Sequence, residues 1–598
     1  MLRARIVSAQ VALAALATAW AAASLWPLLA VPFAAALLTP LPTRRRSLPP
    51  SRDAATLLAR LHPGAALTPA DLDGAEVAVL EDVDGLAAVV ELGDAAGLTS
   101  EPLPPLPPLA TLLPSAADDA PEIRLQLLII TVPPAEDAAH RSLTGARVPA
   151  RQRVLLTVRA RRSGGYARQT LDQALRAALR RAVRQLERSG VPARPLPARS
   201  ALSAFEESAH CTSPPAPLVE TRSAVEAATH VHAAFRVAAQ GQGSLLETLT
   251  SIPTSTTAVA LTVTSRTPAL DVVVRLTVPA DGGSAPGSAP GSAPGSAAAL
   301  HRAEEALRQA ATADGTRIRR LDGTQLDGLT ATLPFGAAAT GPTAALTGLL
   351  STDRLPPGSA ATATGPAAAV TGPAATATGS APGGRPAAGT GSRSEGGRAA
   401  VESRLVLGRA GVVLGLDRHG GPVPIRLFRD LPTRVTLITG LRCAQQLIMR
   451  AAATGADVVI QSADPGAWAP FLGRLGSSVS IKAADRAQPL PDPTPARPQL
   501  LVVDSGPAPP SRPWRTTLLA RPHLEPADAE ALRASDLVIL QSLPGPQAAL
   551  AADALGLNES AAWLPKVGPD MLAIVVTGHC VRWADLATTP HERRLTGR

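Results

Sequence analysis

The first region of the chain is an uncharged, almost wholly apolar run from Ile6 to Leu41. One membrane-spanning helix needs about 20 apolar residues, so the run is long enough for two short helices, with a break available at Pro27. Arginines precede the run at 3 and 5 and follow it at 44–46. Because positive residues stay cytoplasmic, basic flanks at both ends favour an even number of crossings. The pattern predicts a transmembrane hairpin over residues 1–47; a single tilted span and a cleaved signal peptide are the alternatives.

Residues 50–335 alternate between strand-like and helix-like patterns. Two similar units stand out, each with two apolar strands followed by one long helix. The expected elements are strands at 123–132 and 151–160 with a helix at 167–189, then strands at 258–265 and 269–278 with a helix at 299–312. A hairpin is expected ahead of them, at 76–92. We therefore expect a cytoplasmic α+β domain over this region.

Glycine, alanine, serine and proline dominate two segments. Residues 282–299 repeat a Gly-Ser-Ala-Pro unit between a strand and its helix, which indicates an inserted loop. Residues 336–402 contain few charges and almost no large apolar side chain. Because such a composition cannot bury a core, this segment is predicted to be a disordered linker.

Apolar strands alternate with helices after the linker. This pattern predicts a parallel, Rossmann-like α/β domain over residues 403–598, with helices on both faces of its sheet. The expected strands are 435–440, 456–462, 478–482, 499–504, 536–542 and 571–576. A helix is expected at 442–454, and a hairpin at 411–428.

The turn after the first of these strands lies where a nucleotide hydrolase has its phosphate loop. That loop reads G-x-x-x-x-G-K-[ST]: backbone amides and the lysine surround the phosphates, and the hydroxyl holds magnesium. Here the turn reads TGLRCAQQ, with Gly440 as its one glycine and Arg442 as the nearby charge. The strand QLLVVD ends in Asp504, but Ser505 stands where the catalytic carboxylate is expected. The pattern indicates a degenerate P-loop fold. Gly440, Arg442 and Asp504 form its weak candidate anion site, at a helix N-terminus.

Composition argues against nucleic-acid binding. The 57 basic residues include only two lysines, and aromatic residues make up 2% of the chain. This bias toward arginine, alanine and proline is typical of a high-GC genome, and a net charge of +9 is modest for 598 residues. Aromatic side chains are not interleaved with the arginines to stack bases. We therefore predict no nucleic-acid partner.

The sequence offers no metal or catalytic set. The three cysteines, at 211, 443 and 580, are far apart and in no metal-ligand spacing. His230 and His232 share one strand face, but no third ligand is evident. No acid, base and nucleophile are paired convincingly, so no enzyme activity and no cofactor are predicted.

A ridge of arginines runs along the expected helix at 167–189. Arg176, Arg180, Arg184 and Arg188 recur every four residues beside an apolar stripe. This ridge could meet anionic lipid headgroups or an acidic partner protein. The alternative interpretation is a solvent-exposed face whose arginines reflect the codon bias of the genome.

Taken in order, these features resemble the EccE component of type VII secretion systems. The likeness covers about residues 1–330. It lies in the basic-flanked apolar run, in EPLPPLPPLATLL at 101–113, and in the strand, loop, Arg/Ala helix and SGVPARPL that follow from Arg153. The linkers and the C-terminal α/β region depart from the compact family pattern.

The resemblance implies a non-catalytic subunit of the inner membrane, with most of the chain cytoplasmic. Its expected partners are the lipid bilayer and EccB-like, EccC-like and EccD-like subunits, with the ATPase motor supplied by the EccC-like one. We therefore expect a structural subunit that stabilises a protein-secretion complex. The alternative is a membrane-tethered, nucleotide-binding regulator that uses the degenerate phosphate loop.

Overall fold

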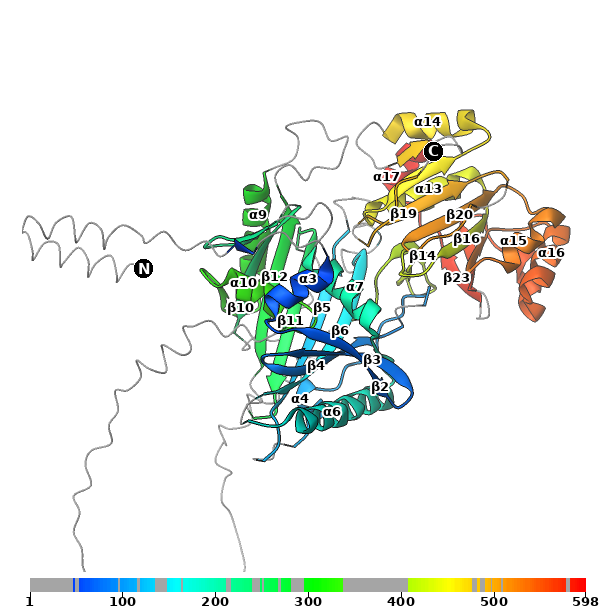
Figure 1. Ribbon diagram of the computed structural model, residues 1–598. Coiled ribbons are helices and arrows are strands. Elements are labelled where there is room, and N and C mark those ends of the chain that lie inside the picture. The colour runs from blue at the N-terminus through cyan, green and yellow to red at the C-terminus, as the bar shows by residue number, and fades with distance from the viewer. Residues whose placement is uncertain are drawn as a thin grey trace, which may run out of the picture.

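The computed structural model describes residues 47–48, 53–336 and 407–597, with internal gaps at 95–96, 116–118, 135–142, 144–147, 163–164, 211–216, 228, 239–247, 250–251, 267–269, 281–294, 476–480, 484–489, 496, 507–508 and 577–580. Two sheets organise these residues, and each has helices packed against its faces (Figure 1).

The N-terminal sheet has thirteen strands, and neighbouring strands are antiparallel. Eleven follow one path, in the order β1-β8-β9-β10-β12-β11-β5-β6-β4-β3-β2, while β13 pairs with β10 and β7 with β4. The bounds are β1 Ser47–Leu48, β2 Ala66–Leu72, β3 Ala75–Asp82, β4 Gly85–Leu92, β5 Ile123–Val132, β6 Arg151–Arg161, β7 Ala193–Pro195, β8 Leu218–Glu220, β9 Val225–Glu226, β10 His230–Val237, β11 Thr256–Thr264, β12 Asp271–Pro279 and β13 Ile318–Arg320. Strand β5 lies near the centre and is buried along nearly its whole length, including the polar Arg124, Gln126 and Thr131 among its apolar residues.

Two units of the same topology lie side by side in this sheet. Each unit has three strands followed by a long helix. A short strand comes next and pairs with the first strand of the unit, and a second helix ends the unit. The first unit is β4-β5-β6-α6-β7-α7 and the second is β10-β11-β12-α9-β13-α10, with helices α6 Arg168–Arg188, α7 Ala198–Ala209, α9 Ser296–Ala313 and α10 Gln325–Ala331. The units meet where β5 pairs with β11, with Leu127 opposite Leu261. Helix α9 is therefore the structural counterpart of α6.

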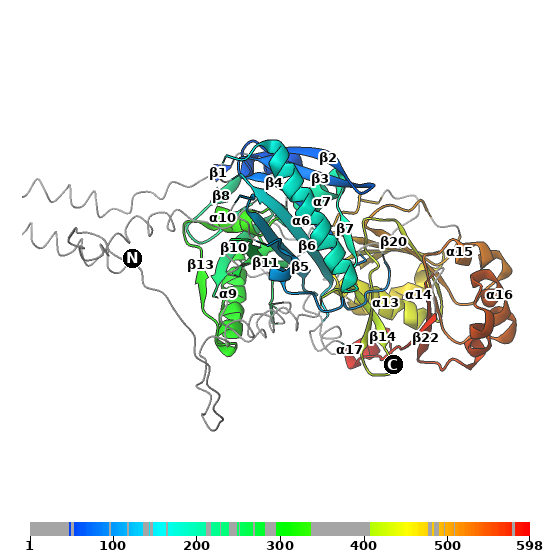
Figure 2. The same ribbon diagram turned by 90° about the horizontal axis from the view of Figure 1, so that it is seen from below.

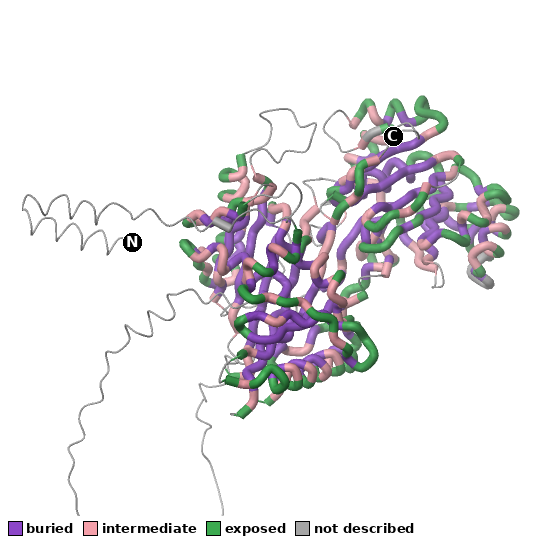
Figure 3. Tube along the Cα trace, in the orientation of Figure 1, coloured by how far each residue is buried: buried purple, intermediate pink, exposed green. Residues whose placement is uncertain are grey.

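Helices cover both faces of the N-terminal sheet. Helices α6, α9 and α4 (Leu109–Leu112) pack on one face, and α3 (Ala54–Leu61), α7 and α10 pack on the other. Figure 2 shows α6 and α9 lying across the same face of the sheet. Buried residues concentrate in the central strands, whereas exposed ones lie on the outer sides of the helices, along the edge strand β2 and in turns (Figure 3).

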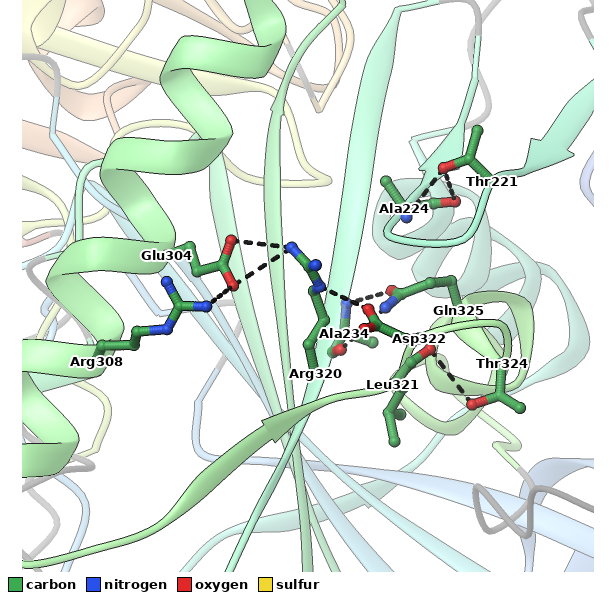
Figure 4. A network of polar contacts seen from close by, with 10 residues as sticks. All are labelled: Thr221, Ala224, Ala234, Glu304, Arg308, Arg320, Leu321, Asp322, Thr324 and Gln325. Atoms are coloured by element: carbon green, nitrogen blue, oxygen red, sulfur yellow. Dashed lines mark hydrogen bonds and ion pairs between the residues drawn. The ribbon is translucent and has the colours of Figure 1, made fainter. Parts of the chain in front are cut away.

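Polar contacts fix the end of the second unit (Figure 4). The Gln325 side chain accepts from the Ala234 N–H at 2.7 Å and donates to the Ala234 carbonyl at 3.4 Å. Glu304 of α9 accepts from Arg308 at 2.6 Å and pairs with Arg320 of β13 at 3.2 Å. These charges on α9 are thus neutralised within the unit itself.

The C-terminal sheet has ten strands in the order β15-β14-β23-β22-β21-β16-β20-β19-β17-β18. The six from β21 to β18 are parallel, and β22, β23, β14 and β15 add antiparallel neighbours. The bounds are β14 Val412–Leu416, β15 Pro422–Ile425, β16 Thr433–Ile438, β17 Asp457–Gln461, β18 Ile481–Ala483, β19 Gln499–Val503, β20 Arg515–Arg521, β21 Leu537–Leu540, β22 Met571–Val576 and β23 Val581–Asp585.

Helices pack on both faces of this sheet as well. Those on one face are α13 Leu441–Ala453, α14 Pro465–Leu475 and α17 Pro590–Thr596, and those on the other are α15 Ala529–Arg533, α16 Gly545–Leu555 and the 3-10 helix η3 Asn558–Lys566. The 3-10 helix η2, Pro526–Asp528, leads into α15.

The two sheets are tied together by an exchange of short segments. Residues 98–103 follow β4 but bond to the C-terminal half: the Leu98 carbonyl accepts from the Arg426 N–H at 2.8 Å, and Leu98 packs in the C-terminal core. In return, Leu407 packs in the N-terminal core and its carbonyl accepts from the Leu103 N–H at 2.7 Å. Gly408 has φ +87, and a Cβ there would lie 2.8 Å from the Glu101 carbonyl oxygen, so only glycine fits this crossing.

The predicted fold class is wrong. Within the described ranges no helix is long and apolar enough to span a membrane. The hairpin predicted at 1–47 and the linker predicted at 336–402 lie almost wholly outside those ranges. The C-terminal sheet is mixed rather than parallel, and the two predicted units are parts of one larger antiparallel sheet. The apolar pattern reports how fully a strand is buried, but it does not report the direction of the neighbouring strand.

Candidate functional site

The carboxyl edge of the parallel strands is the place where open α/β sheets bind ligands. Strand β16 lies at the centre of this edge, between β20 and β21, and both neighbours run parallel to it. Its chain continues directly into α13. A nucleotide would need its phosphates held at this junction, because the amides at the start of α13 point toward it.

Two residues alone, Thr439 and Gly440, join β16 to α13. A phosphate loop needs several residues between strand and helix, so that backbone amides can surround the phosphate. The Gly440 N–H instead donates to the Gln541 side chain at 3.3 Å, and the Thr439 N–H donates to the Arg521 carbonyl at 3.1 Å. The junction is a short turn closed by its own neighbours rather than a loop around a ligand.

Gly440 has none of the properties that a phosphate-loop glycine needs. Its φ is −63, which any residue adopts, and a Cβ placed on it would meet nothing within 4 Å. Three residues on, Cys443 stands in the first turn of α13, but its thiol is buried in the core rather than aimed at the edge. Burial raises the pKa of that thiol to about 11. Cys443 therefore supplies no thiolate at this edge, and the Thr439 hydroxyl of the turn donates to the Gly440 carbonyl at 3.3 Å.

The Asp504 side chain is hydrogen-bonded to the neighbouring loop. Its carboxylate accepts hydrogen bonds from the Ser462 hydroxyl, from the Ala463 N–H at 3.1 Å and from the Trp468 indole N–H at 3.1 Å. Partial burial raises the pKa of Asp504, but these hydrogen bonds outweigh it and hold the pKa below its ordinary value. The carboxylate thus anchors the connection between β17 and α14.

The structure does not bring the three predicted anion-site residues together. Gly440 and Arg442 begin α13, whereas Asp504 follows β19, which lies two strands away from β16, or about 10 Å across the sheet. Arg442 is exposed and forms no hydrogen bond or ion pair among the described residues. Arg521 ends the strand between them, and its guanidinium donates to the Gly506 carbonyl at 3.0 Å.

Sequence analysis missed Arg521 and Gln541, which close this edge. Arg521 also bonds Asp528 at 3.3 Å, and Gln541 bridges the Gly440 N–H to the Pro569 carbonyl, to which it donates at 2.9 Å. Arg521 is the last residue of β20, and Gln541 directly follows β21. A position at the carboxyl end of an apolar strand is the one signal that could have identified them.

The far half of α13 is pinned by a buried ion pair. Arg450 and Glu592 make two contacts, at 2.6 Å and 3.0 Å, and the side chains are 3% and 0% exposed. Arg450 also donates to the Leu414 carbonyl at 2.6 Å and to the Leu586 carbonyl at 3.0 Å. This network fixes α13 against both β14 and α17.

The predicted arginine ridge on α6 divides into two halves. Arg176 bonds Asp172 at 2.7 Å and the Asp71 carbonyl at 2.7 Å, while Arg180 bonds Asp73 at 3.0 Å. In contrast, Arg184 and Arg188 are exposed and form no hydrogen bond or ion pair with any described residue. The N-terminal half of the ridge therefore has a structural role, whereas the C-terminal half has no partner among the described residues.

Three histidines gather where α7 meets β10. His210 caps α7 in the left-handed conformation, and its ring lies 4.3 Å from that of His230 and 5.7 Å from that of His232. Within the described ranges, no three His, Cys, Asp or Glu side chains are placed to hold a metal ion. Burial, reinforced by the charge of Arg275, lowers the pKa of His230 to about 4 and that of His232 well below its usual range. The cluster is neutral near pH 7.

A cavity of about 560 Å³ lies between the two halves. Charged side chains line it, but they neutralise one another: Arg153 pairs with Glu91 at 2.7 Å and with Glu207 at 3.0 Å. Arg151 stands over the Trp514 ring, 5.7 Å from its centroid. This cavity is thus a polar contact region between the halves, without excess charge to attract an ionic ligand.

No family model and no curated protein matches the chain. Among solved structures, the chain is similar to the genome packaging NTPase B204 from Sulfolobus turreted icosahedral virus 2, in complex with ATP-gammaS and in complex with AMPPCP. The identities are 12% and 11%, the alignments cover 26% of this chain and 98% and 99% of those chains, and the TM-scores are 0.19 and 0.20. At such scores the likeness carries no argument about function.

Proposed function

We propose that this protein is a non-catalytic structural subunit of a type VII-like protein-secretion complex. In this role it stabilises the assembly around a separate ATPase and hydrolyses no nucleotide itself. The observation that carries the proposal is the two-residue turn of Thr439 and Gly440 between β16 and α13. That turn leaves no loop to surround a phosphate.

Two further observations support a structural role. Asp504, the carboxylate nearest in pattern to a magnesium-binding residue, is held by Ser462 and Trp468. The two halves of the chain also exchange segments at 98–103 and 407–411, which suits a rigid body that presents fixed surfaces to partners. The secretion context rests on the resemblance of residues 101–113 and of the region from Arg153 to the EccE family.

The test is purification of the tagged full-length chain in mild detergent, followed by mass spectrometry of the proteins that accompany it. We expect an FtsK-type ATPase and EccB-like and EccD-like subunits in one large complex. Recovery of the chain alone, under conditions that preserve other complexes of the same cells, would contradict the proposal.

A thermal-shift titration with Mg-ATP tests the alternative of a nucleotide-binding regulator. A protein that binds nucleotide in its folded state melts at a higher temperature as the nucleotide concentration rises. We expect no shift, and no difference between the wild-type chain and the Arg442→Ala variant. A saturable shift that Arg442→Ala abolishes would favour the regulator and overturn the non-catalytic, nucleotide-free role.

A further inference from the structure

The C-terminal half of α6 carries three arginines that form no ion pair with a described residue, and the single carboxylate of this half is the exposed Glu187. Helix α6 has six arginines and only two acidic residues. Its first three arginines have carboxylate partners: Arg168 pairs with Glu81, Arg176 with Asp172, and Arg180 with Asp73. Of the other three, Arg181 reaches only the Thr111 carbonyl at 3.4 Å. We call the remaining group, Arg181, Arg184 and Arg188, the α6 patch.

The duplicated fold provides an internal control for this charge. Helix α9 occupies the same place in the second unit and packs on the same face of the sheet as α6. It carries two arginines and two glutamates, and its Arg308 is paired with Glu304. Because one genome encodes both helices, an arginine-rich codon bias does not account for a charge excess on α6 alone.

The side chains of the α6 patch lie on a single surface of the helix. Positions 181, 184 and 188 are spaced i, i+3 and i+7, so they share one face of the helix and span about 10 Å. Together with Gln185 they line one hollow. The helix dipole favours a cation in the last turn, so it stabilises the charge of Arg188. Arg184 lies nearer the middle of the helix, where the dipole stabilises its charge less. Like charges three or four residues apart repel one another, and a bound anion would remove that repulsion.

The surroundings favour a protein rather than a membrane or a nucleic acid. The apolar stripe of α6 is buried against the sheet, so the helix has no apolar face to insert into a bilayer. Among the described residues, the exposed large apolar side chains are Val83, Leu431, Leu441, Trp563 and Met571, and none lies on α6. Three arginines are also fewer than the four to eight typical of anionic-lipid recognition. The residues that line the hollow of the α6 patch include no aromatic ring to stack a base.

We infer that the α6 patch is the docking site for an acidic segment of a partner protein, with carboxylates spaced to meet Arg184 and Arg188. A helix with Asp or Glu at i and i+4 matches that spacing. The inference rests on the proposed function, since it assigns one surface of a structural subunit to one contact in the complex.

The test measures binding of a fluorescein-labelled polyglutamate peptide to the full-length chain by fluorescence anisotropy. We expect Arg184→Glu to weaken binding about tenfold, because it removes one ion pair and adds a repulsion. Arg184→Lys keeps the charge and should retain most of the binding. The matched control is Arg302→Glu, which reverses an exposed charge on α9 and should leave binding unchanged.

Equal binding by the wild type and Arg184→Glu, or equal losses for Arg184→Glu and Arg302→Glu, would overturn the inference. Binding of the wild type to phosphatidylserine vesicles but not to polyglutamate would overturn it in favour of a lipid. The same variants in the copurification experiment should lose one partner with Arg184→Glu and none with Arg302→Glu. If the wild type copurifies with no subunit, the proposed function fails, whereas the peptide experiment still reports on the patch.

Discussion

Trp468 donates its indole N–H to the carboxylate of Asp504 across 3.1 Å, and this bond decides the role of the acidic strand end. Replacing Asp504 with Ala leaves the indole N–H and the Ser462 hydroxyl without their acceptor. We expect a loss of about 1–3 kcal/mol in the free energy of unfolding, because unpaired polar groups pay a desolvation cost. Urea unfolding measures it. An Asp504→Ala variant of unchanged stability would show that the carboxylate is available for another role.

Replacement of Gly440 by Ala should be nearly neutral. The residue has an ordinary φ of −63 and open space around the position of a Cβ. We expect a change of about 0.5 kcal/mol or less in the free energy of unfolding. The matched comparison is Gly408→Ala, where φ is +87 and the Cβ would meet the Glu101 carbonyl oxygen, so a clear loss is expected. Thermal unfolding of both variants separates the two cases, and equal losses would contradict the account of the turn.

The ion pair of Arg450 and Glu592 should be among the most sensitive positions. Replacing Arg450 with Met leaves the Glu592 carboxylate, which is fully buried, without its cation. Breaking a buried pair from one side typically costs about 3–5 kcal/mol. Arg442→Ala, an exposed arginine on the same helix, is the control and should change stability by about 0.5 kcal/mol or less. A small effect of Arg450→Met in denaturant unfolding would contradict the prediction.

The histidine cluster predicts a loss of stability in mild acid. The folded-state pKa of His230 is lowered to about 4, and those of His210 and His232 lie well below 6.5, chiefly through burial. Between pH 6.5 and about 4 the unfolded chain therefore binds protons that the folded chain does not, so stability is full above pH 6.5 and falls as the pH is lowered. His230 contributes about 1.4 kcal/mol per pH unit across this window, and His210 and His232 add to the loss in the same direction.

Substitution of a single histidine tests this assignment. The melting temperature of His232→Gln should fall less steeply between pH 6.5 and 5 than that of the wild type. The control is His301→Gln, at an exposed position on α9, which should leave the slope of melting temperature against pH unchanged. Burial raises the pKa of Asp82, but the contacts with His62 and Arg159 outweigh it and lower the pKa to about 2. The stability that depends on the ionised Asp82 is therefore lost only below this pH window. Identical slopes in all three proteins would rule out the cluster as the source.

Cleavage of the chain between its halves should leave them associated. A specific protease site introduced between residues 341 and 400 would cut the covalent connection, but the exchanged segments at 98–103 and 407–411 still hold the interface. We expect the two fragments to elute together in size-exclusion chromatography. Leu98→Asp places a charge in the C-terminal core and should separate them after cleavage. Separation of the two fragments after cleavage of the protein that keeps Leu98 would show that the interface depends on the covalent connection.

The local content of the fold could be predicted from the sequence. The apolar strand at 123–132 and the helix at 167–189 are written in patterns of two and about 3.6 residues, which depend on near neighbours alone. The missing phosphate-loop residues are also a local property, because the motif is contiguous. Spatial partners were not predictable in this way. Arg180 meets Asp73 across 107 positions, and nothing in the spacing of the arginines indicates which of them would be paired.

The sequence by itself therefore determined the position of strongly patterned elements such as β5 and α6, and that the chain lacks the residues of a phosphate loop. It missed β20, which lies beside β16 in the C-terminal sheet. Tertiary structure alone decided that the two units share one antiparallel sheet, that His210 joins His230 and His232, and that Asp504 bonds Trp468 rather than standing beside Gly440. The reason is physical. Periodicity records which side of each element is buried, whereas strand pairing and ion pairing depend on chain segments that meet only when the whole core forms.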